Sequence, residues 1–447
     1  MVTRKKQAAG IAVLVFLLAF SLIACGGKSA KGSGAAAASG GVAGKDLKAE
    51  PGAELEFVYW EGSTADKRGF DYLVEQFTKD HPEIKLKPQV YPSSTYRDQL
   101  DTRIAANDWP DVMRYTYQRL GKFKEAGVML DLTEKISEES LTDLVPAFRS
   151  ALTHEGKLVG MPHHTDTVAL YYNKRMFAES GIRIPNDPQD GWTWDELNQI
   201  AAKLKADHKL DYAFGGIWDN GSGYRFLPFV YAAGGAILSP DQTTIAVNSP
   251  EFLKALSLYE GWRKDNLVAR TGFTQTSQTN MLFVAQQTAF TFSGSWHISY
   301  MQENMPDNWG ITYMPKIDGK TGSDMGGNGL FGYAKTKYPN AAAIFIDYVT
   351  SKDVVRGFCE VSNFIPVRQS LIKEGINYSA YQPEMQTLLG IVSTIDPKMA
   401  SDETSTRFQQ LNIIFGEEMD PLAINGSVTA QQVIANLERR MTQALKE

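Results

Sequence analysis

Apolar and polar positions along this chain alternate between two periods, the two-residue period of a β-strand and the 3.6-residue period of an α-helix. Residues 55–60 alternate as a half-buried strand does, and residues 70–77 place apolar side chains on one face of a helix. Strand-like runs return at 84–90 and 110–113, with a helix-like segment at 96–106 between them. Strands and helices in this order predict a parallel sheet with right-handed crossovers, and hence an α/β fold.

Longer helices are predicted in the second part of the chain, and two of them carry clear start signals. Thr193, with Glu196 three residues later, forms a capping box before a helix. Ser249 followed by Pro250 opens another, with serine at the N-cap and proline in the first turn. The predicted helices cover residues 194–208, 250–264, 340–350 and 430–445.

The longest apolar run, Ile11–Ala24, lies behind three basic residues at the amino terminus. It is shorter than the roughly 20 residues that span a bilayer. Basic residues, an apolar run and then small residues are typical of a secretory signal peptide, here residues 1–24, with an uncleaved membrane anchor as the alternative. Its end resembles a bacterial lipobox, which implies lipidation of Cys25. We therefore expect a lipoprotein anchored in the cell membrane on its extracytoplasmic face.

Composition limits the size, the partners and the redox chemistry of the chain. Residues 25–54 are mostly Gly, Ala, Ser and Lys, which predicts a flexible linker, and residues 55–447 suit two domains better than one core. A net charge of −6 and no basic run after the signal peptide argue against nucleic acid as a partner. If Cys25 carries lipid, Cys359 has no disulfide partner, and its apolar surroundings predict a buried structural thiol.

Aromatic side chains gather in the predicted loops. In open α/β sheets ligands bind beyond the carboxyl ends of the strands, where a ring offers a flat surface to the C–H face of a sugar. Each ring taken singly is as compatible with a core position, but loops run over the surface. The pattern therefore favours a carbohydrate site built with some of Trp60, Trp109, Trp218, Tyr224 and Trp296.

The sequence contains only weak matches to the motifs that are typical of enzymes. Residues 327–332 fit Gly-x-Gly-x-x-Gly, but the following stretch is strand-like, whereas a dinucleotide-binding motif needs a helix there. His154-Glu155 lacks the second histidine of a zinc protease motif, and the chain has neither a Gly-x-Ser-x-Gly elbow nor a Walker A loop. We expect no enzyme and no cofactor. A surface-anchored glycan hydrolase stays open as an alternative, because a carboxylate pair needs to be close only in space.

Several motif blocks occur in a fixed order behind the lipobox. They include Gly160-Met161-Pro162 leading to Tyr171-Tyr172-Asn173-Lys174-Arg175-Met176-Phe177, and the blocks at 192–197, 226–235, 287–296, 326–329 and 365–368. In this order and spacing, the chain resembles the family 1 extracellular solute-binding proteins, the substrate-binding lipoproteins of carbohydrate ABC transporters. The resemblance covers nearly the whole mature chain.

This resemblance implies a two-lobed periplasmic-binding-protein-like fold, with discontinuous lobes joined by a multi-strand hinge. Lobe 1 would be residues 55–165 plus 311–336, and lobe 2 residues 166–310 plus 337–447. Crossings between the lobes would lie near 163–167, 310–313 and 333–337. The implied function is capture of a sugar or oligosaccharide in the cleft and delivery to the permease subunits by hinge closure. The implied state is a monomer that binds the membrane only through its lipid.

The resemblance also implies a set of ligand-binding residues. Trp296 would be the main stacking platform, Asp166 the leading carboxylate, and Asp111 either a sugar ligand or the cap of a turn. Gly327 and Asn328 would bring backbone close to the ligand. Arg407 is a weaker candidate. The full implied set is Trp60, Glu61, Asp111, Arg114, Asp166, Trp218, Asn220, Tyr224, Trp296, Gly327 and Asn328.

Two further readings concern other ligands. His163 and His164 with Asp166 would be a metal site, but no other histidine lies nearby in the sequence, and we expect no metal. The same fold would suit a polyamine if several carboxylates lined the cleft, which Glu61, Asp111, Asp166 and Asp219 leave open. A glycerophosphodiester would instead require Arg or Lys at the cleft.

Overall fold

The computed structural model describes residues 47–446 apart from residues 217, 219, 220, 276–278, 393, 394 and 396. The predicted signal peptide, the lipidation site Cys25 and most of the predicted linker lie outside the described residues. Within the described part, no helix is long and apolar enough to cross a membrane.

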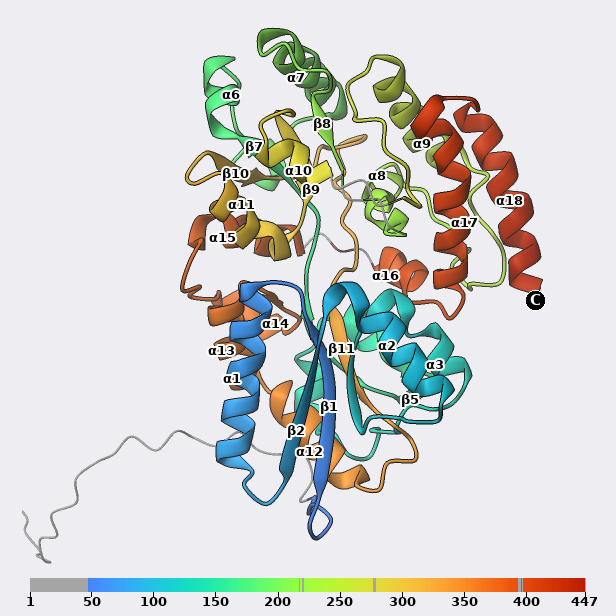
Figure 1. The fold of residues 1–447 in the computed structure, drawn as a ribbon. Helices are drawn as coiled ribbons and strands as arrows, with labels where there is room; N and C mark the ends of the chain where they lie inside the picture. Colours follow the sequence, from blue (N-terminus) through green and yellow to red (C-terminus); the bar gives the residue numbers. More distant parts are fainter. Residues whose placement is uncertain are drawn as a thin grey trace, which may run out of the picture. The chain divides into compact units, whose positions relative to one another are not determined.

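A six-stranded mixed sheet forms the first of two hydrophobic layers, in the lower half of Figure 1. β1 pairs in parallel with both β2 and β3, as the alternation of strand and helix predicted. β11 runs antiparallel between β3 and β6, and β12 closes the edge beside β6. The strand order is β12 (Ile365–Pro366), β6 (Met161–Thr165), β11 (Asn328–Gly332), β3 (Val112–Thr116), β1 (Glu54–Glu61) and β2 (Lys85–Pro92).

Helix α1 (Thr64–Asp80) covers this sheet with the apolar face that the periodicity predicted, since Phe70, Leu73 and Phe77 are fully buried. Helices α12 (Pro339–Val349) and α13 (Lys352–Ser362) pack beside α1. Cys359 is a buried free thiol on α13.

The segment 339–366 therefore belongs to the core of the first sheet, whereas the predicted boundaries place it with the second lobe. The physical reason is the apolar face of α13: Val355 and Phe358 are fully buried in the same core as Phe70. An apolar helix face of this kind shows that the face is buried but not which sheet buries it.

A four-stranded sheet organises the second hydrophobic layer, in the upper half of Figure 1. Its order is β10 (Trp309–Thr312), β7 (Ala169–Asn173), β9 (Phe290–Ser293) and β8 (Phe214–Gly215). Both predicted caps are present: Thr193 and Glu196 form a reciprocal capping box on α7 (Trp194–Asp207), and Ser249 caps α9 (Pro250–Lys264). Trp194 and Trp262 stack between these two helices with ring centroids 4.3 Å apart.

Shorter elements complete the described fold. A hairpin joins β4 (Thr153–His154) to β5 (Lys157–Leu158). The remaining α-helices are α2 (Ser93–Ala105), α3 (Gly121–Glu125), α4 (Glu138–Thr142), α5 (Pro146–Ala151), α6 (Lys174–Glu179), α8 (Leu227–Ala232), α10 (Thr279–Val284), α11 (Ile298–Asn304), α14 (Gln369–Glu374), α15 (Gln382–Val392), α16 (Pro397–Glu403), α17 (Phe408–Asp420) and α18 (Ala430–Lys446). One-turn helices η1 (Tyr117–Arg119), η3 (Gly223–Phe226) and η4 (Ser295–His297) carry residues of interest below.

Within the described residues, two segments join a strand of one sheet to a strand of the other: residues 166–168 lead from β6 to β7, and residues 323–327 lead into β11. They lie side by side, because Thr165 Oγ1 donates to the Gly326 carbonyl at 2.9 Å and the Val168 N–H donates to Asp324 Oδ1 at 3.2 Å. The crossing predicted at 310–313 falls instead largely in β10 of the second sheet. The crossing predicted at 333–337 follows β11 within the first layer, where the Tyr333 N–H donates to the Asp111 carbonyl. The division into two lobes stays a prediction. Its boundaries now lie at residues 166–168 and 323–327 and not at 310–313 or 333–337.

Glu403, at the end of α16, is fully buried against the second crossing segment. Its Oε2 accepts hydrogen bonds from Gln118 Nε2 at 3.0 Å and from the Met325 N–H at 3.2 Å. Its other oxygen has no hydrogen-bond partner among the described residues. Burial, followed by the nearby Asp324 carboxyl, raises the pKa of Glu403 well above its ordinary value.

We predict that Glu403→Gln makes the protein more stable relative to wild type as the pH rises. A carboxyl whose pKa is raised by folding favours the native state fully below its unfolded pKa, and this contribution is lost as the pH rises through the folded value. Glutamine keeps an acceptor for Gln118 without the buried charge. Urea unfolding at pH 5 and pH 8 should show the difference in unfolding free energy moving in favour of the variant by about 1 kcal/mol or more.

Glu75→Gln, at an exposed position of α1, is the matched control and should follow the wild-type pH trend. Parallel pH profiles for wild type and Glu403→Gln would contradict the prediction.

Candidate ligand-binding site

The carboxyl end of β1 presents Trp60 and Glu61 at the edge of the first sheet. Trp60 is partly exposed, and the Arg114 guanidinium lies 3.8 Å from the centre of its ring. Arg114 Nη1 donates to the Trp60 carbonyl at 2.8 Å and to Asp66 Oδ1 at 3.0 Å. Glu61 is half-buried, and burial raises the pKa of its carboxyl. No hydrogen bond joins the Glu61 carboxylate to the part of the chain that the structure describes, so its oxygens are available to a ligand hydroxyl.

Arg114 itself is enclosed by protein. Its Nε is a sealed, unpartnered nitrogen, and its Nη2 lies 3.4 Å from His164 Nε2 and 3.2 Å from the side-chain amide of Asn328. Asn328 is 3% exposed. The structure thus places Arg114 against Trp60 as a support of the strand end, with Asn328 packed against Arg114 and His164, and both side chains are almost fully enclosed by protein.

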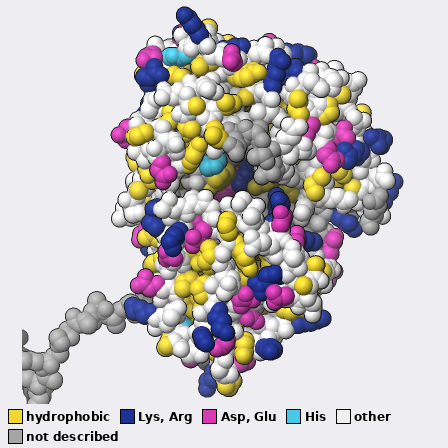
Figure 2. Space-filling model, in the orientation of Figure 1, with side chains coloured by type: hydrophobic (Ala, Val, Ile, Leu, Met, Phe, Trp, Pro, Cys, Tyr) yellow, Lys and Arg dark blue, Asp and Glu magenta, His cyan; other side chains and the backbone are white. Residues whose placement is uncertain are grey.

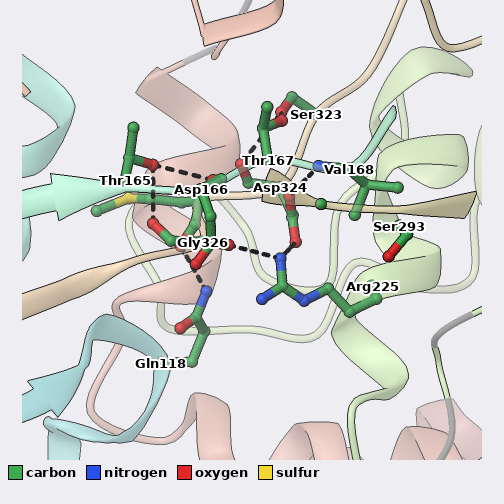
Figure 3. Close-up of polar contacts among 12 residues, drawn as sticks. Gln118, Thr165, Asp166, Thr167, Val168, Arg225, Ser293, Ser323, Asp324 and Gly326 are labelled. Atoms are coloured by element: carbon green, nitrogen blue, oxygen red, sulfur yellow. Dashed lines mark hydrogen bonds and ion pairs between the residues drawn. The ribbon is translucent and has the colours of Figure 1, made fainter. Parts of the chain in front are cut away.

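A second cluster lies at the crossing segments, where Arg225 reaches two carboxylates (Figure 3). Arg225 Nη1 donates to Asp166 Oδ1 at 2.9 Å and to Asp324 Oδ2 at 2.6 Å. The side chains of Arg225 and Asp166 are each 10% exposed, and Asp324 is fully buried. Burial raises the pKa of Asp324 to about 6 although Arg225 lowers it, and the neighbouring Asp166 adds to the increase.

Aromatic rings flank the same guanidinium. The Arg225 carbon Cζ lies 4.2 Å from the centre of the Trp296 ring and 4.8 Å from that of Tyr224. Trp296 is partly exposed on η4, while Tyr224 on η3 is 9% exposed. Cation–π attraction therefore holds one ring face of Trp296 against Arg225. The surface in Figure 2 is hollowed at mid-height, at the level where the two halves of the molecule meet.

Other predicted residues lie elsewhere. Trp218 is fully buried, with its ring among Phe226, Tyr259 and Phe273, so it is core rather than a wall of the site. Asn220, and Asp219 of the polyamine reading, lie outside the described residues.

Asp111 lies at the amino end of β3, opposite the end that carries the candidate site. Its Oδ2 accepts from the Glu56 N–H at 2.9 Å and its Oδ1 from Thr336 Oγ1 at 2.5 Å. Both oxygens accept hydrogen bonds within the first layer, which is a structural role different from the predicted cap of the next turn.

Gly327 and Arg407 also have structural explanations. Gly327 has φ +98° and lies so close to the His164 carbonyl that a Cβ would clash with it. It brings backbone against β6, which explains the glycine without a ligand. Arg407 precedes α17 and pairs with Glu125, with 3.4 Å between Nε and Oε1.

Sequence reasoning missed Arg225, Asp324 and Arg119. Arg225 directly follows Tyr224, but no local pattern shows that it meets two carboxylates 59 and 99 residues away. Arg119, partly buried on η1, makes no hydrogen bond or ion pair with any described residue. Burial and the nearby Arg97 lower the pKa of Arg119, and the Tyr224 hydroxyl is within electrostatic reach.

The two adjacent histidines contact each other, with 2.9 Å between His163 Nδ1 and His164 Nδ1. Burial and Arg114 lower the pKa of His163 to about 3, and that of His164 also lies well below its ordinary value. In the described part of the chain, no three metal-ligating side chains come together in a way that could hold an ion. The arrangement suits neutral imidazoles packed against Phe358 and Phe364.

Each of the two groups of residues offers contacts that suit a molecule with both apolar and hydroxyl-bearing surfaces. Trp60 and Trp296 provide ring faces or edges, Glu61 provides an acceptor and Arg225 provides donors. Grooves of about 430 Å³ at α2 and about 640 Å³ between α7 and α9 lie elsewhere and include none of these side chains.

Comparison with known proteins agrees with this geometry. The mannitol-binding protein of Pseudomonas aeruginosa is 22% identical over 84% of this chain and 89% of its own length. The sn-glycerol-3-phosphate-binding periplasmic protein of Escherichia coli is 23% identical over 90% of this chain and 94% of its own length. An ABC substrate-binding protein of Listeria monocytogenes, solved in complex with cycloalternan, superposes with a TM-score of 0.75 at 20% identity, covering 88% of this chain and 99% of its own.

The GacH receptor of Streptomyces glaucescens superposes with a TM-score of 0.72 at 22% identity over the same shares of the two chains. Both superpositions confirm the predicted α/β fold of a two-lobed periplasmic binding protein. Residues 61–356, more than half of the chain, match the family of bacterial extracellular solute-binding proteins. The chain belongs to that family.

Proposed function

We propose that this protein is the substrate-binding lipoprotein of an ABC importer and that it captures an uncharged sugar, oligosaccharide or polyol. The observation that carries the proposal is the Arg225 cluster: a guanidinium with free donors, its charge more than offset by Asp166 and Asp324, beside the partly exposed Trp296 ring. Aromatic faces and charge-assisted donors together suit a ligand with C–H faces and hydroxyl groups. Relatives named for mannitol or solved with cycloalternan support this class.

The proposal extends to location and delivery. A lipid on Cys25 and the linker behind it would keep the protein near the permease subunits and raise its effective concentration there. Closure of the lobes would rest on the crossing segments 166–168 and 323–327, because ligand contacts to both layers favour a closed state. We propose a monomer that needs no cofactor.

The cluster argues against the glycan hydrolase alternative. A hydrolase needs one protonated and one ionised carboxyl group that both reach the glycosidic bond. Here Arg225 bridges Asp166 and Asp324 through a single nitrogen, and Asp324 is fully buried. These carboxylates therefore serve the guanidinium and not a substrate, which favours binding without catalysis.

Arg119 favours a second candidate, a phosphate-bearing polyol. Its guanidinium has no carboxylate partner among the described residues, and burying a lone charge is unfavourable unless a ligand compensates it. The relative named for sn-glycerol 3-phosphate belongs to this class. The Glu61 carboxylate and the net negative Asp166–Asp324–Arg225 cluster weigh against it.

A ligand screen tests the proposal. The protein lacking residues 1–46 should gain thermal stability with at least one of mannitol, tagatose, maltose or a larger α-glucan. Ligand at a hundredfold excess over its Kd stabilises by about 2.7 kcal/mol, which shifts Tm by several degrees. A shift with sn-glycerol 3-phosphate alone would support the second candidate. Release of glucose from an α-glucan on prolonged incubation would support the hydrolase.

We predict that Trp296→Ala weakens binding of the best ligand by about tenfold or more, because it removes the ring that lines the guanidinium. Isothermal titration calorimetry measures the effect. Trp109→Ala is the matched control: Trp109 is also partly exposed, but it stacks on Tyr333 with ring centroids 4.6 Å apart, at the amino end of β3. Equal affinities for the two variants would remove Trp296 from the site.

A further inference from the structure

Two nitrogen atoms of Arg225 are unused. The hydrogen bonds to Asp166 and Asp324 both come from Nη1, and Nε and Nη2 have no partner among the described residues. The side chain is nine-tenths buried, but neither of these nitrogens is sealed from solvent, in contrast to Nε of Arg114. Arg225 thus has open donors in a position where most of the side chain is fixed.

The position of these donors is rigid. Two carboxylates on two different crossing segments hold Nη1, and the rings of Tyr224 and Trp296 lie against the guanidinium. A guanidinium presents its N–H groups in a planar fork, so fixing one nitrogen and the plane also fixes the direction of the other two. The edge formed by Nε and Nη2 matches two neighbouring acceptor oxygens.

The charge of the cluster indicates which acceptors fit. One cation is shared by two carboxyl groups, so the guanidinium brings no net positive charge to a ligand. A carboxylate or phosphate at the open edge would meet the field of Asp166 as well as that of Arg225. Adjacent hydroxyl oxygens gain hydrogen bonds from a charged donor without this repulsion.

We infer that Arg225 is a specificity-determining residue of the ligand site, whose Nε and Nη2 donate to two adjacent hydroxyl oxygens of an uncharged sugar or polyol. The inference rests on the proposed function and adds the contact that selects the ligand. It also assigns to Arg225 the role that the sequence had suggested for Arg114.

The test compares Arg225→Lys with wild type, using the best neutral ligand from the screen and its monodeoxy analogues in calorimetric titrations. Lysine keeps the charge for Asp166 but loses the fork. Affinity should fall about 10- to 100-fold, the range for hydrogen bonds to a charged group. Removing one of the two selected hydroxyls should weaken binding to wild type by a similar factor, but binding to Arg225→Lys by much less.

Arg440→Lys is the matched control, because Arg440 on α18 also pairs with two carboxylates, Glu417 and Glu418, away from the candidate site. It should bind like wild type. If Arg225→Lys also binds like wild type, or loses the same factor for every analogue, the inference is overturned, because Arg225 would then act only through the fold.

A crystal structure of the wild-type protein with the same ligand decides the matter even where Arg225→Lys does not fold. Ligand oxygens within about 3.2 Å of Nε and Nη2 support the inference, and an ordered ligand with no oxygen near either atom overturns it. The two proposals fail separately: a wild-type protein that binds no neutral sugar or polyol contradicts the proposed function, whereas intact binding without Arg225 contradicts only the inference.

Discussion

The shared ion pair of Arg225 with Asp166 and Asp324 is the constraint on which the middle of this molecule depends. Charges this deeply buried are tolerated only when they are paired and hydrogen-bonded. Because the carboxylates come from segments 158 residues apart, they satisfy the guanidinium only when both segments lie in register. Thr165 Oγ1 to the Gly326 carbonyl and Val168 N–H to Asp324 maintain that register. The same ion pair fixes the plane of the guanidinium, and therefore also the orientation of the aromatic rings packed against it.

The close approach of the two crossing segments explains the glycine motif at 326–329. A Cβ on Gly326 would clash with Asp166 Oδ1, and one on Gly327 with the His164 carbonyl. Small residues here let two backbone segments approach as closely as the ion pair requires. The motif is therefore structural in this protein, although its sequence suits close approach to a ligand equally well.

The helices and strands of the fold could be predicted because each is marked by a pattern of residues close together in the sequence. The alternation at 55–60, the apolar face at 70–77 and the box of Thr193 with Glu196 depend on neighbours within a few residues. Which sheet buries residues 339–366 depends on contacts with residues far away in the sequence. The predicted boundaries placed this segment with the second lobe, whereas the structure packs it on the first sheet. The same holds for the site. Trp60 and Trp296 could be predicted because they lie at a strand end and a turn, whereas Arg225 could not, because its partners are remote in the sequence. Trp218 lies next to a glycine-rich turn, as a surface residue would, yet it is fully buried among five aromatic rings.

A neutralised guanidinium also bears on how one fold serves different ligands. Relatives over most of this chain's length are named for mannitol and for sn-glycerol 3-phosphate, which share hydroxyl groups but differ in charge. If Asp166 and Asp324 balance Arg225 for structural reasons, the ion pair does not need to change when the ligand does. Discrimination by charge then comes from the field of Asp166 together with charged groups outside the ion pair. In this chain those groups are Glu61, which repels an anion, and Arg119, which attracts one, and they lie on different elements of the first layer. We propose that the charges of Asp166, Glu61 and Arg119 together set the preference between the two ligand classes, while Arg225 donates hydrogen bonds to the hydroxyl groups that both classes carry.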